Sequence, residues 1–283
     1  MKKLTYIILF VSLFFSAGIF AQNQSETDTI LELKKHPLLT DKFLVTAGLY
    51  APSKTIKIGI DGSSENDVID LNESFDLDQR EETFAGSVVW RFSKKWHLGV
   101  EYFNVRTSYG TVLEENLEWE DVEFVAGLEA EIGFGLNMYR IFFGRTLTSG
   151  DKHEWGVGLG AHAMDIKTYL EGSVYLDDDS LGFERRDAEV IAPVPNIGTW
   201  YYWAPNEKLA LTARIDWFAL TIKEYSGSLW NLAPSVRYQV IKNVGVGVSY
   251  RYFITKLNID QSNWNGSIRV GFHGPLFMLT ANF

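Results

Sequence analysis

The sequence predicts an all-β protein: a transmembrane, antiparallel, up-and-down β-barrel of about ten strands. Three features predict it: an N-terminal export signal, apolar residues at every second position over most of the chain, and polar connections that alternate between short and long. The 283 residues include no Cys, which excludes disulfides, thiolate metal sites and a cysteine nucleophile. The net charge of −10 excludes a basic nucleic-acid-binding domain.

Residues 1–21 have the three-part pattern of a secretory signal peptide. A positive start of two lysines precedes an apolar run over residues 6–15, and Ala21 supplies a small residue at the expected cleavage point. The alternative is an uncleaved membrane anchor, but the apolar run is short for a bilayer span of ~20 residues. We therefore expect export, followed by a polar lead-in segment over residues 22–41 on the periplasmic side.

From residue 42 to residue 283 the dominant period of the sequence is two, which is typical of strands. Val244 and Val246, for example, alternate with Gly245 and Gly247. We predict one barrel domain over residues 42–283. Its ten expected strands cover residues 42–60, 83–92, 96–113, 122–147, 154–176, 188–203, 208–224, 229–240, 244–259 and 264–283.

Two of these strands are the least regular. The fourth contains a glycine-rich stretch, Gly127–Gly135, which indicates a bulge or a break. The sixth contains Pro193 and Pro195, which have no N–H to donate to a neighbouring strand. Counts of eight or twelve strands therefore stay open.

The second face of the strands decides between a soluble barrel and a membrane barrel. A soluble barrel carries Lys, Glu and Thr on the face that meets water. Here the second face carries mainly Gly, Ser, Thr, Asn and Arg. We interpret the apolar face as facing lipid and the small and cationic residues as lining the interior. Because an open sheet edge is costly in lipid, the sheet is expected to close.

Aromatic residues cluster beside the short turns, where a barrel places its membrane-interface girdle. The alternative is an ordinary aromatic core of a soluble sandwich. The charges also sort by side: lysines occupy the short turns, while residues 61–82, 114–123 and 177–189 are rich in acids. The predicted interface aromatics are Trp90, Phe92, Trp96, Tyr202, Trp203 and Phe283.

Several segments resemble an uncharacterised family of Gram-negative outer-membrane β-barrel proteins. They are residues 91–92, 96–103, 192–198, 209–218, 225–229 and 274–283. The resemblance extends from about Lys42 to Phe283 and implies a barrel in the outer membrane, but no reaction. Phe283, with Leu279 and Ala281 before it, also resembles the C-terminal signal that the barrel assembly machinery reads.

The alternation places eight polar side chains inside the barrel, with five arginines against two acids. A cationic interior has two interpretations: a pore or pocket that attracts anions, or a narrow lumen filled by salt bridges and hydrogen bonds. We favour the second, since charges without water must be paired. The predicted lumen-lining residues are Arg91, Glu101, Arg140, His162, Arg214, Asp216, Arg237 and Arg251.

No motif for catalysis or for metal binding stands out. The sequence has no Gly-x-Ser-x-Gly, no His-Glu-x-x-His and no phosphate-binding loop. His162 and His273 are mid-strand candidates without a partnered Ser or Asp motif. The acidic run Asp177–Asp179 could hold Ca²⁺ or Mg²⁺, but it lacks EF-hand spacing and is better interpreted as a solvated acidic face. We predict no catalytic residue, no metal site and no cofactor.

The leading hypothesis is a non-enzymatic membrane protein, either a structural barrel or a narrow conduit for small solutes, anionic ones among them. One alternative is a hydrolase at the barrel rim that acts on lipid or peptide. Another is an adhesion or recognition surface formed by the acidic loops. The expected partners are outer-membrane lipid and lipopolysaccharide, with divalent ions as a bridge to its phosphates, and the assembly machinery through Phe283. No nucleic-acid partner is expected.

Overall fold

The computed structural model describes residues 35–60, 68–70, 82–113, 117–119, 122–175, 181–222, 225–261 and 264–283. The compact unit Lys35–Asn282 is described here by itself. No helix in these ranges is long and apolar enough to cross a membrane. The elements are α2 (Pro37–Thr40), β1 (Phe43–Tyr50), β2 (Ser53–Ile60), β3 (Val68–Asp70), β4 (Thr83–Arg91), β5 (Trp96–Val112), β6 (Leu117–Trp119), β7 (Val122–Phe124), β8 (Glu129–Ser149), β9 (His153–Tyr175), β10 (Leu181–Trp203), β11 (Leu209–Ile222), β12 (Tyr225–Leu232), β13 (Ser235–Ile241), β14 (Val244–Gln261) and β15 (Trp264–Asn282).

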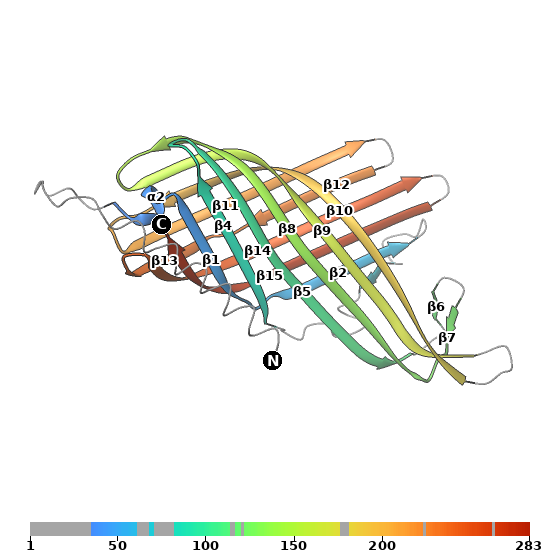
Figure 1. The fold of residues 1–283 in the computed structure, drawn as a ribbon. Helices are drawn as coiled ribbons and strands as arrows, with labels where there is room; N and C mark the ends of the chain where they lie inside the picture. Colours follow the sequence, from blue (N-terminus) through green and yellow to red (C-terminus); the bar gives the residue numbers. More distant parts are fainter. Residues whose placement is uncertain are drawn as a thin grey trace, which may run out of the picture. The chain divides into compact units, whose positions relative to one another are not determined.

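The long strands form a closed antiparallel ring with ten positions (Figure 1). β1 and β2 share one position because both pair with β15, and β12 and β13 share another because both lie between β11 and β14. Around the ring the order is β1/β2, β4, β5, β8, β9, β10, β11, β12/β13, β14 and β15, which pairs back with β1. This confirms the predicted up-and-down barrel of about ten strands.

The interruptions of the strands occur at prolines and at one glycine. Pro52 lies between β1 and β2, and Pro234 lies between β12 and β13. Neither residue has an N–H to continue the ladder. Gly127 has a φ of 79° and lies in the gap between β7 and β8, so the predicted fourth strand is broken at this point. β10 is longer than predicted and begins at Leu181 instead of residue 188.

The wall opens between β10 and β11. β10 pairs with β9 along its whole length, from Leu181 to Trp203, but with β11 only from Ile197 onward. Pro193 and Pro195 come just before this point. Alternate residues of a strand direct their N–H groups to the same neighbour, so both donors are missing on the same side. The ladder with β9 continues through both prolines, so this side faces β11. The prolines therefore end the ladder with β11 and leave the ladder with β9 intact.

Among the described residues, a second opening lies between β2 and β5. The end of β5 from Asn104 to Val112 pairs with β8 alone, whereas β2 pairs with β15 and β3. Among the described residues the ring is thus complete near the short turns at 92–95, 150–152, 204–208 and 242–243, and we call this part the short-turn half. Beyond the two openings the strands form two walls, and we call this part the forked half. One wall is β5, β8, β9 and β10; the other is β11, β12, β14, β15, β2 and β3 (Figure 1).

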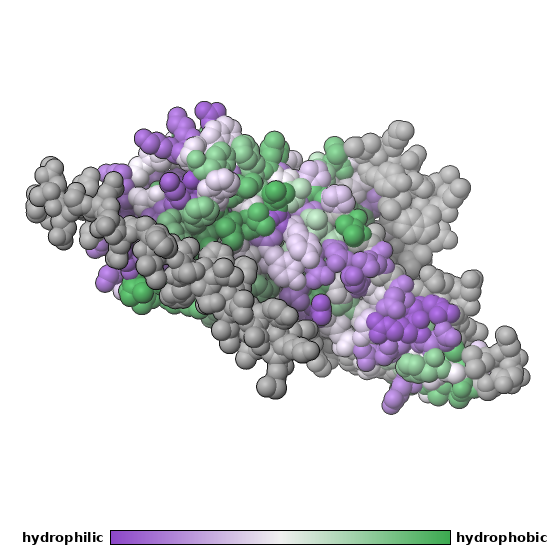
Figure 2. Space-filling view, in the orientation of Figure 1, coloured by the Kyte–Doolittle hydropathy of each residue, from purple (hydrophilic) through white to green (hydrophobic). Residues whose placement is uncertain are grey.

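The outer surface carries an apolar belt. Outward side chains such as Leu159, Ile191 and Leu279 are more than 60% exposed, as expected for contact with lipid rather than water. Along β10 the belt runs from Trp203 to Ile191, which at ~3.3 Å per residue and a tilt of ~45° spans about 28 Å. Figure 2 shows hydrophobic residues gathered over the upper middle of the visible face, with hydrophilic residues at its left end and at the lower right.

The interior differs between the two halves. In the forked half the inward side chains are apolar and belong to one buried cluster, which corrects the expectation that small and cationic residues line the whole interior. In the short-turn half the interior is polar and charged. The apolar cluster includes Phe103, Val105, Phe134, Leu136, Met138, Met164, Ile166, Leu170, Leu229, Phe253, Val270 and Phe272.

Candidate functional site: an ion-pair network across the barrel

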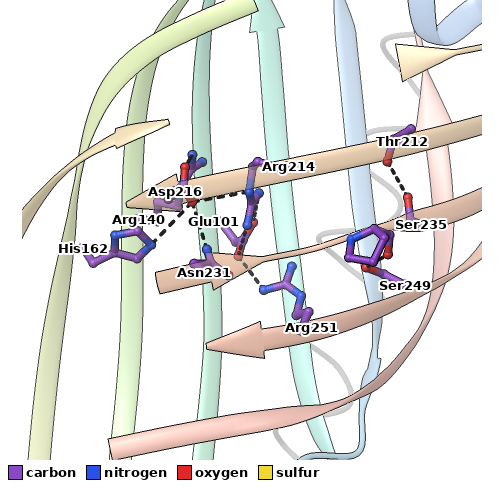
Figure 3. Close-up of polar contacts among 11 residues, drawn as sticks. Glu101, Arg140, His162, Thr212, Arg214, Asp216, Asn231, Ser235, Ser249 and Arg251 are labelled. Carbon is purple, nitrogen blue, oxygen red and sulfur yellow. Dashed lines mark hydrogen bonds and ion pairs between the residues drawn. The ribbon is translucent and has the colours of Figure 1, made fainter. Parts of the chain in front are cut away.

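Two arginines reach across the interior to one carboxylate (Figure 3). Arg214 of β11 donates from Nη1 and Nη2 to the two carboxylate oxygens of Glu101, at 2.7 and 3.3 Å. Arg251 of β14 donates to the same group at 2.5 Å. β5, which carries Glu101, is adjacent to neither β11 nor β14 in the ring. These ion pairs therefore cross the lumen instead of following the wall.

A second carboxylate completes the network. Arg140 Nη2 of β8 donates to Asp216 Oδ1 of β11 at 2.6 Å, again between strands that are not neighbours. Asn231 Nδ2 donates to Asp216 Oδ2 at 2.9 Å, and His162 Nε2 lies 3.9 Å from the same oxygen. Asp216 is fully buried. Its space depends on Gly198, since a Cβ at that position would collide with the Asp216 carboxylate.

A further polar layer lies nearer the short turns. Arg91 donates to Glu154 at 2.5 Å and to the Leu38 carbonyl at 2.7 Å. Trp200 Nε1 donates to the other oxygen of Glu154 at 2.9 Å. His97 lies 3.3 Å from the Arg91 guanidinium and is buried. This layer connects strands β4, β9 and β10 with the segment before the barrel.

Helix α2 covers this layer. Pro37 begins the helix, and the His36 ring nitrogen Nδ1 accepts a hydrogen bond from the Leu38 N–H as the N-terminal cap. Leu38 packs against Ala204 and Ala210 at the ends of β10 and β11. Residues 35–41 of the predicted lead-in segment are thus bound to the barrel.

All eight predicted lumen-lining residues point into the barrel. Five of them, Glu101, Arg140, Arg214, Asp216 and Arg251, make the cross-lumen ion pairs, and His162 lies beside them. Arg91 belongs to the polar layer nearer the short turns. Arg237 alone has no carboxylate partner among the described residues.

The sequence reasoning missed Glu154 and His97. Both are buried partners of Arg91, and His97 lies close to the short turn at residues 92–95. Glu154 has the same parity as His162 on one strand, so the alternation already indicated that it faces inward. Glu154 lies at the end of the strand, next to a short turn, so the alternation was not applied to it.

The predicted interface aromatics divide into two groups. Trp90, Phe92 and Trp203 have exposed outer faces, and Trp96 stacks on Phe143 with ring centroids 4.9 Å apart. Tyr202 is a correction: it packs inside against α2. The reason is the period of two, which places Tyr202 on the opposite face from Trp203. Phe283 directly follows β15.

The two candidate histidines lie in different environments. His162 is buried in the network, whereas His273 lies within 3.0 Å of the exposed Tyr250 hydroxyl on the outer surface. Within the described ranges, no group of three His, Cys, Asp or Glu could hold a metal ion. The acidic run Asp177–Asp179 lies outside the described residues.

Charged residues on the outer surface mark the end of the apolar belt in the forked half. Lys167 Nζ lies 2.9 Å from Glu189, and this hydrogen bond raises the pKa of Lys167. Arg185 contacts Asp187 at 2.9 Å and lowers the pKa of that carboxyl. These groups and Arg106 line a surface hollow of about 700 Å³. The wall of β9 and β10 therefore continues beyond the belt with a polar surface.

This geometry can be compared with known proteins. No family model and no curated protein matches the chain. Among solved structures it is similar to the outer membrane protease OmpT from Escherichia coli, with a TM-score of 0.57 and 13% identity over 89% of this chain and 99% of that one. The fold is that of an outer-membrane β-barrel.

Two further matches to this outer-membrane β-barrel have lower scores than OmpT. The toluene transporter TodX of P. putida gives a TM-score of 0.36 with 9% identity, covering 87% of this chain and 91% of that one. OprG from Pseudomonas aeruginosa gives 0.30 with 12% identity, covering 88% and 98%. At 13% identity the comparison with OmpT establishes the fold alone.

Proposed function

We propose that this protein is a closed, structural β-barrel of the outer membrane, not a conduit for solutes. The observation that carries the proposal is the set of ion pairs from Glu101 and Asp216 across the lumen. Directional charge pairs in a buried site resist displacement, because breaking one leaves an uncompensated charge. The α2 cap forms a second barrier. The apolar belt supports the membrane location, and residues 1–21 supply the expected export signal.

Conductance in planar lipid bilayers tests this proposal. The refolded full-length protein is expected to give no channel events at voltages that leave the bilayer intact. A variant without residues 22–41 is the matched control, because it removes α2 and keeps the ion-pair network. We expect this variant to be silent as well. Stepwise conductance from the full-length protein would overturn the proposal, and a preference for anions would favour the conduit hypothesis.

A second candidate is a recognition surface at the forked end. It is favoured by the β9–β10 ladder, which continues past the apolar belt to Tyr175 and Leu181. These two residues flank the acidic run Asp177–Asp179 in the sequence. Acidic surfaces attract cationic partners, and salt weakens the attraction. Lipopolysaccharide with bridging divalent ions and outer-membrane lipid remain proposed partners, as does the assembly machinery at Phe283.

Binding of vesicles that contain the protein to immobilised polylysine tests the recognition surface. We expect binding that falls as salt rises, and that weakens when the three aspartates of Asp177–Asp179 are changed to Asn. Deletion of residues 61–82 is expected to weaken it further. A matched control is the double variant Lys167→Gln with Glu189→Gln, which keeps the net charge. Binding that is the same in all variants would contradict this candidate.

The absence of enzymatic activity stays a prediction. Neither histidine supports the rim hydrolase, because His162 is enclosed by the ion-pair network and His273 lies beside Tyr250 on the outer surface. Incubation of the refolded protein with labelled lipid A or peptide tests this point, and no product is expected. Turnover that His162→Ala or His273→Ala abolishes would revive the hydrolase.

A further inference from the structure

The charges of the ion-pair network do not balance. Four inward guanidinium groups share two carboxylates. Arg140, Arg214 and Arg251 each contact at least one carboxylate, within 2.5 to 2.7 Å at their shortest distance. The fourth arginine, Arg237, contacts none among the described residues. With His162 uncharged, the cluster carries a formal excess of two positive charges.

Arg237 lies inside the barrel with an unused donor. On β13 its neighbours Val236 and Tyr238 are exposed on the outer face, so Arg237 faces inward. Its Nη1 is buried without a hydrogen-bond partner, and its Nε makes only a long contact, 3.4 Å, to Ser235 Oγ. A buried guanidinium N–H group without an acceptor is costly. Water could accept hydrogen bonds here but could not balance the charge.

The surroundings of Arg237 suit a small anion. Ser235 Oγ and Thr212 Oγ1 lie 2.6 Å apart, and since either atom can donate to the other, one hydroxyl hydrogen remains for another acceptor. Arg237 stands between Ala210 on β11 and Gly247 on β14, which are among the smallest residues. Arg214, Arg251 and the Glu101 carboxylate lie within electrostatic range. Donors and positive charge thus converge in this part of the interior.

We propose that the barrel interior binds a compact inorganic anion at Arg237, between the ion-pair network and the α2 cap. The anion accepts hydrogen bonds from the guanidinium and from the Thr212–Ser235 hydroxyl pair. It offsets part of the buried positive charge. The site lies on the short-turn side of the network, because β13 ends at Ile241 beside the turn at Lys242 and Asn243. The inference goes beyond the proposed function and is independent of whether the barrel conducts.

Thermal unfolding at constant ionic strength tests the site, with chloride or inorganic phosphate replacing gluconate. The melting temperature of the full-length protein is expected to rise by about 3 °C for each tenfold increase of the anion above its Kd. Arg237→Gln is expected to abolish this rise and to be at least as stable as the natural protein in gluconate. The matched control is Arg269→Gln on an exposed position of β15, which should respond as the natural protein does.

Bromide anomalous diffraction locates the anion directly. A peak beside Arg237 that is absent in Arg237→Gln is expected. A melting temperature that no small anion changes, or an Arg237→Gln variant with the full response, would overturn the proposal. The outcome is separate from the conductance test: a conducting barrel with a bromide peak at Arg237 overturns only the closed-barrel function, and a silent barrel without one overturns only this site.

Discussion

The two halves of the barrel are held together in different ways. In the short-turn half the backbone ladder runs around the whole ring, and the interior is crossed by charged pairs. In the forked half the ladder is interrupted twice among the described residues, and the interior is apolar. Two facing sheets without shared edges are held by the packing of their inner faces, as in a sandwich. We infer that apolar packing replaces backbone pairing where the prolines end it.

The largest expected effect comes from breaking the network of the short-turn half. Glu101→Gln leaves Arg251 without a carboxylate and leaves Arg214 with only its longer contact to Asp216, at 3.5 Å. We expect this loss to lower the free energy of unfolding by about 3–5 kcal/mol. Urea unfolding in lipid vesicles measures it. The matched control is Glu171→Gln, whose partner Arg185 is exposed, with an expected loss under about 1 kcal/mol. Equal losses in both variants would show that the network does not brace the barrel.

Truncation of the apolar core tests the forked half. Leu136 is fully buried, so Leu136→Ala is expected to cost about 2–5 kcal/mol through lost burial and the cavity that remains. Leu159→Ala removes the same group from an outward position that is 66% exposed, and we expect a smaller loss. In Leu136→Ala, the backbone amides of the forked half should exchange faster than in the natural protein, before those of the short-turn half do. Uniform exchange along β8 would contradict separate stabilisation of the two halves.

The fold could be predicted from the sequence because it depends on a local period. Alternation along one strand, as at Val244 and Gly245, identifies the face on which each side chain lies, and the short turns set the neighbours. The same reasoning placed Glu101 and Asp216 inside. It could not pair them, because the ion pairs join strands that are far apart in the ring and depend on register and diameter.

The interior of the forked half was predicted wrongly for a physical reason. The glycine and arginine stretches suggested a small, cationic lining throughout, but Phe134, Leu136 and Met138 share the inward parity of β8. In the forked half the strands are apolar on both faces: the outer face contacts lipid, and the inner face packs in the apolar cluster. The opening at Pro193 and Pro195 was visible as an irregularity, but its consequence depends on which neighbour the missing N–H groups face.

Small residues in the short-turn half leave space for the indole ring of Trp200. A Cβ on Gly144 would lie 2.5 Å from Trp200 Cζ3, so Gly144→Ala forces the indole to move. We expect a loss of about 1–3 kcal/mol from this overpacking. Gly110→Ala is the matched control, since its Cβ would lie 3.9 Å from the nearest atom, the Ala130 carbonyl oxygen, in the forked half. A neutral Gly144→Ala would mean that Trp200 has free space beside it.

The smallest effect concerns the α2 cap and pH. Burial lowers the pKa of His36 below 6.5, and the positive charge of Arg237 acts in the same direction, while Asp41 and a backbone hydrogen bond at Lys208 oppose it. The folded state therefore favours the neutral ring, and its contribution to stability is complete above pH 6.5 and is lost as the pH falls through the lowered pKa. We expect α2 to loosen from the barrel as the pH falls below 6.5, measured as faster exchange of its amides. His36→Asn keeps an acceptor for the Leu38 N–H but cannot titrate, so its exchange should not change over this range beyond the intrinsic effect of pH. If amide exchange in α2 quickened equally in the natural protein and in His36→Asn, the titrating group would not be His36. The attachment of α2 to the short-turn half would then be independent of His36.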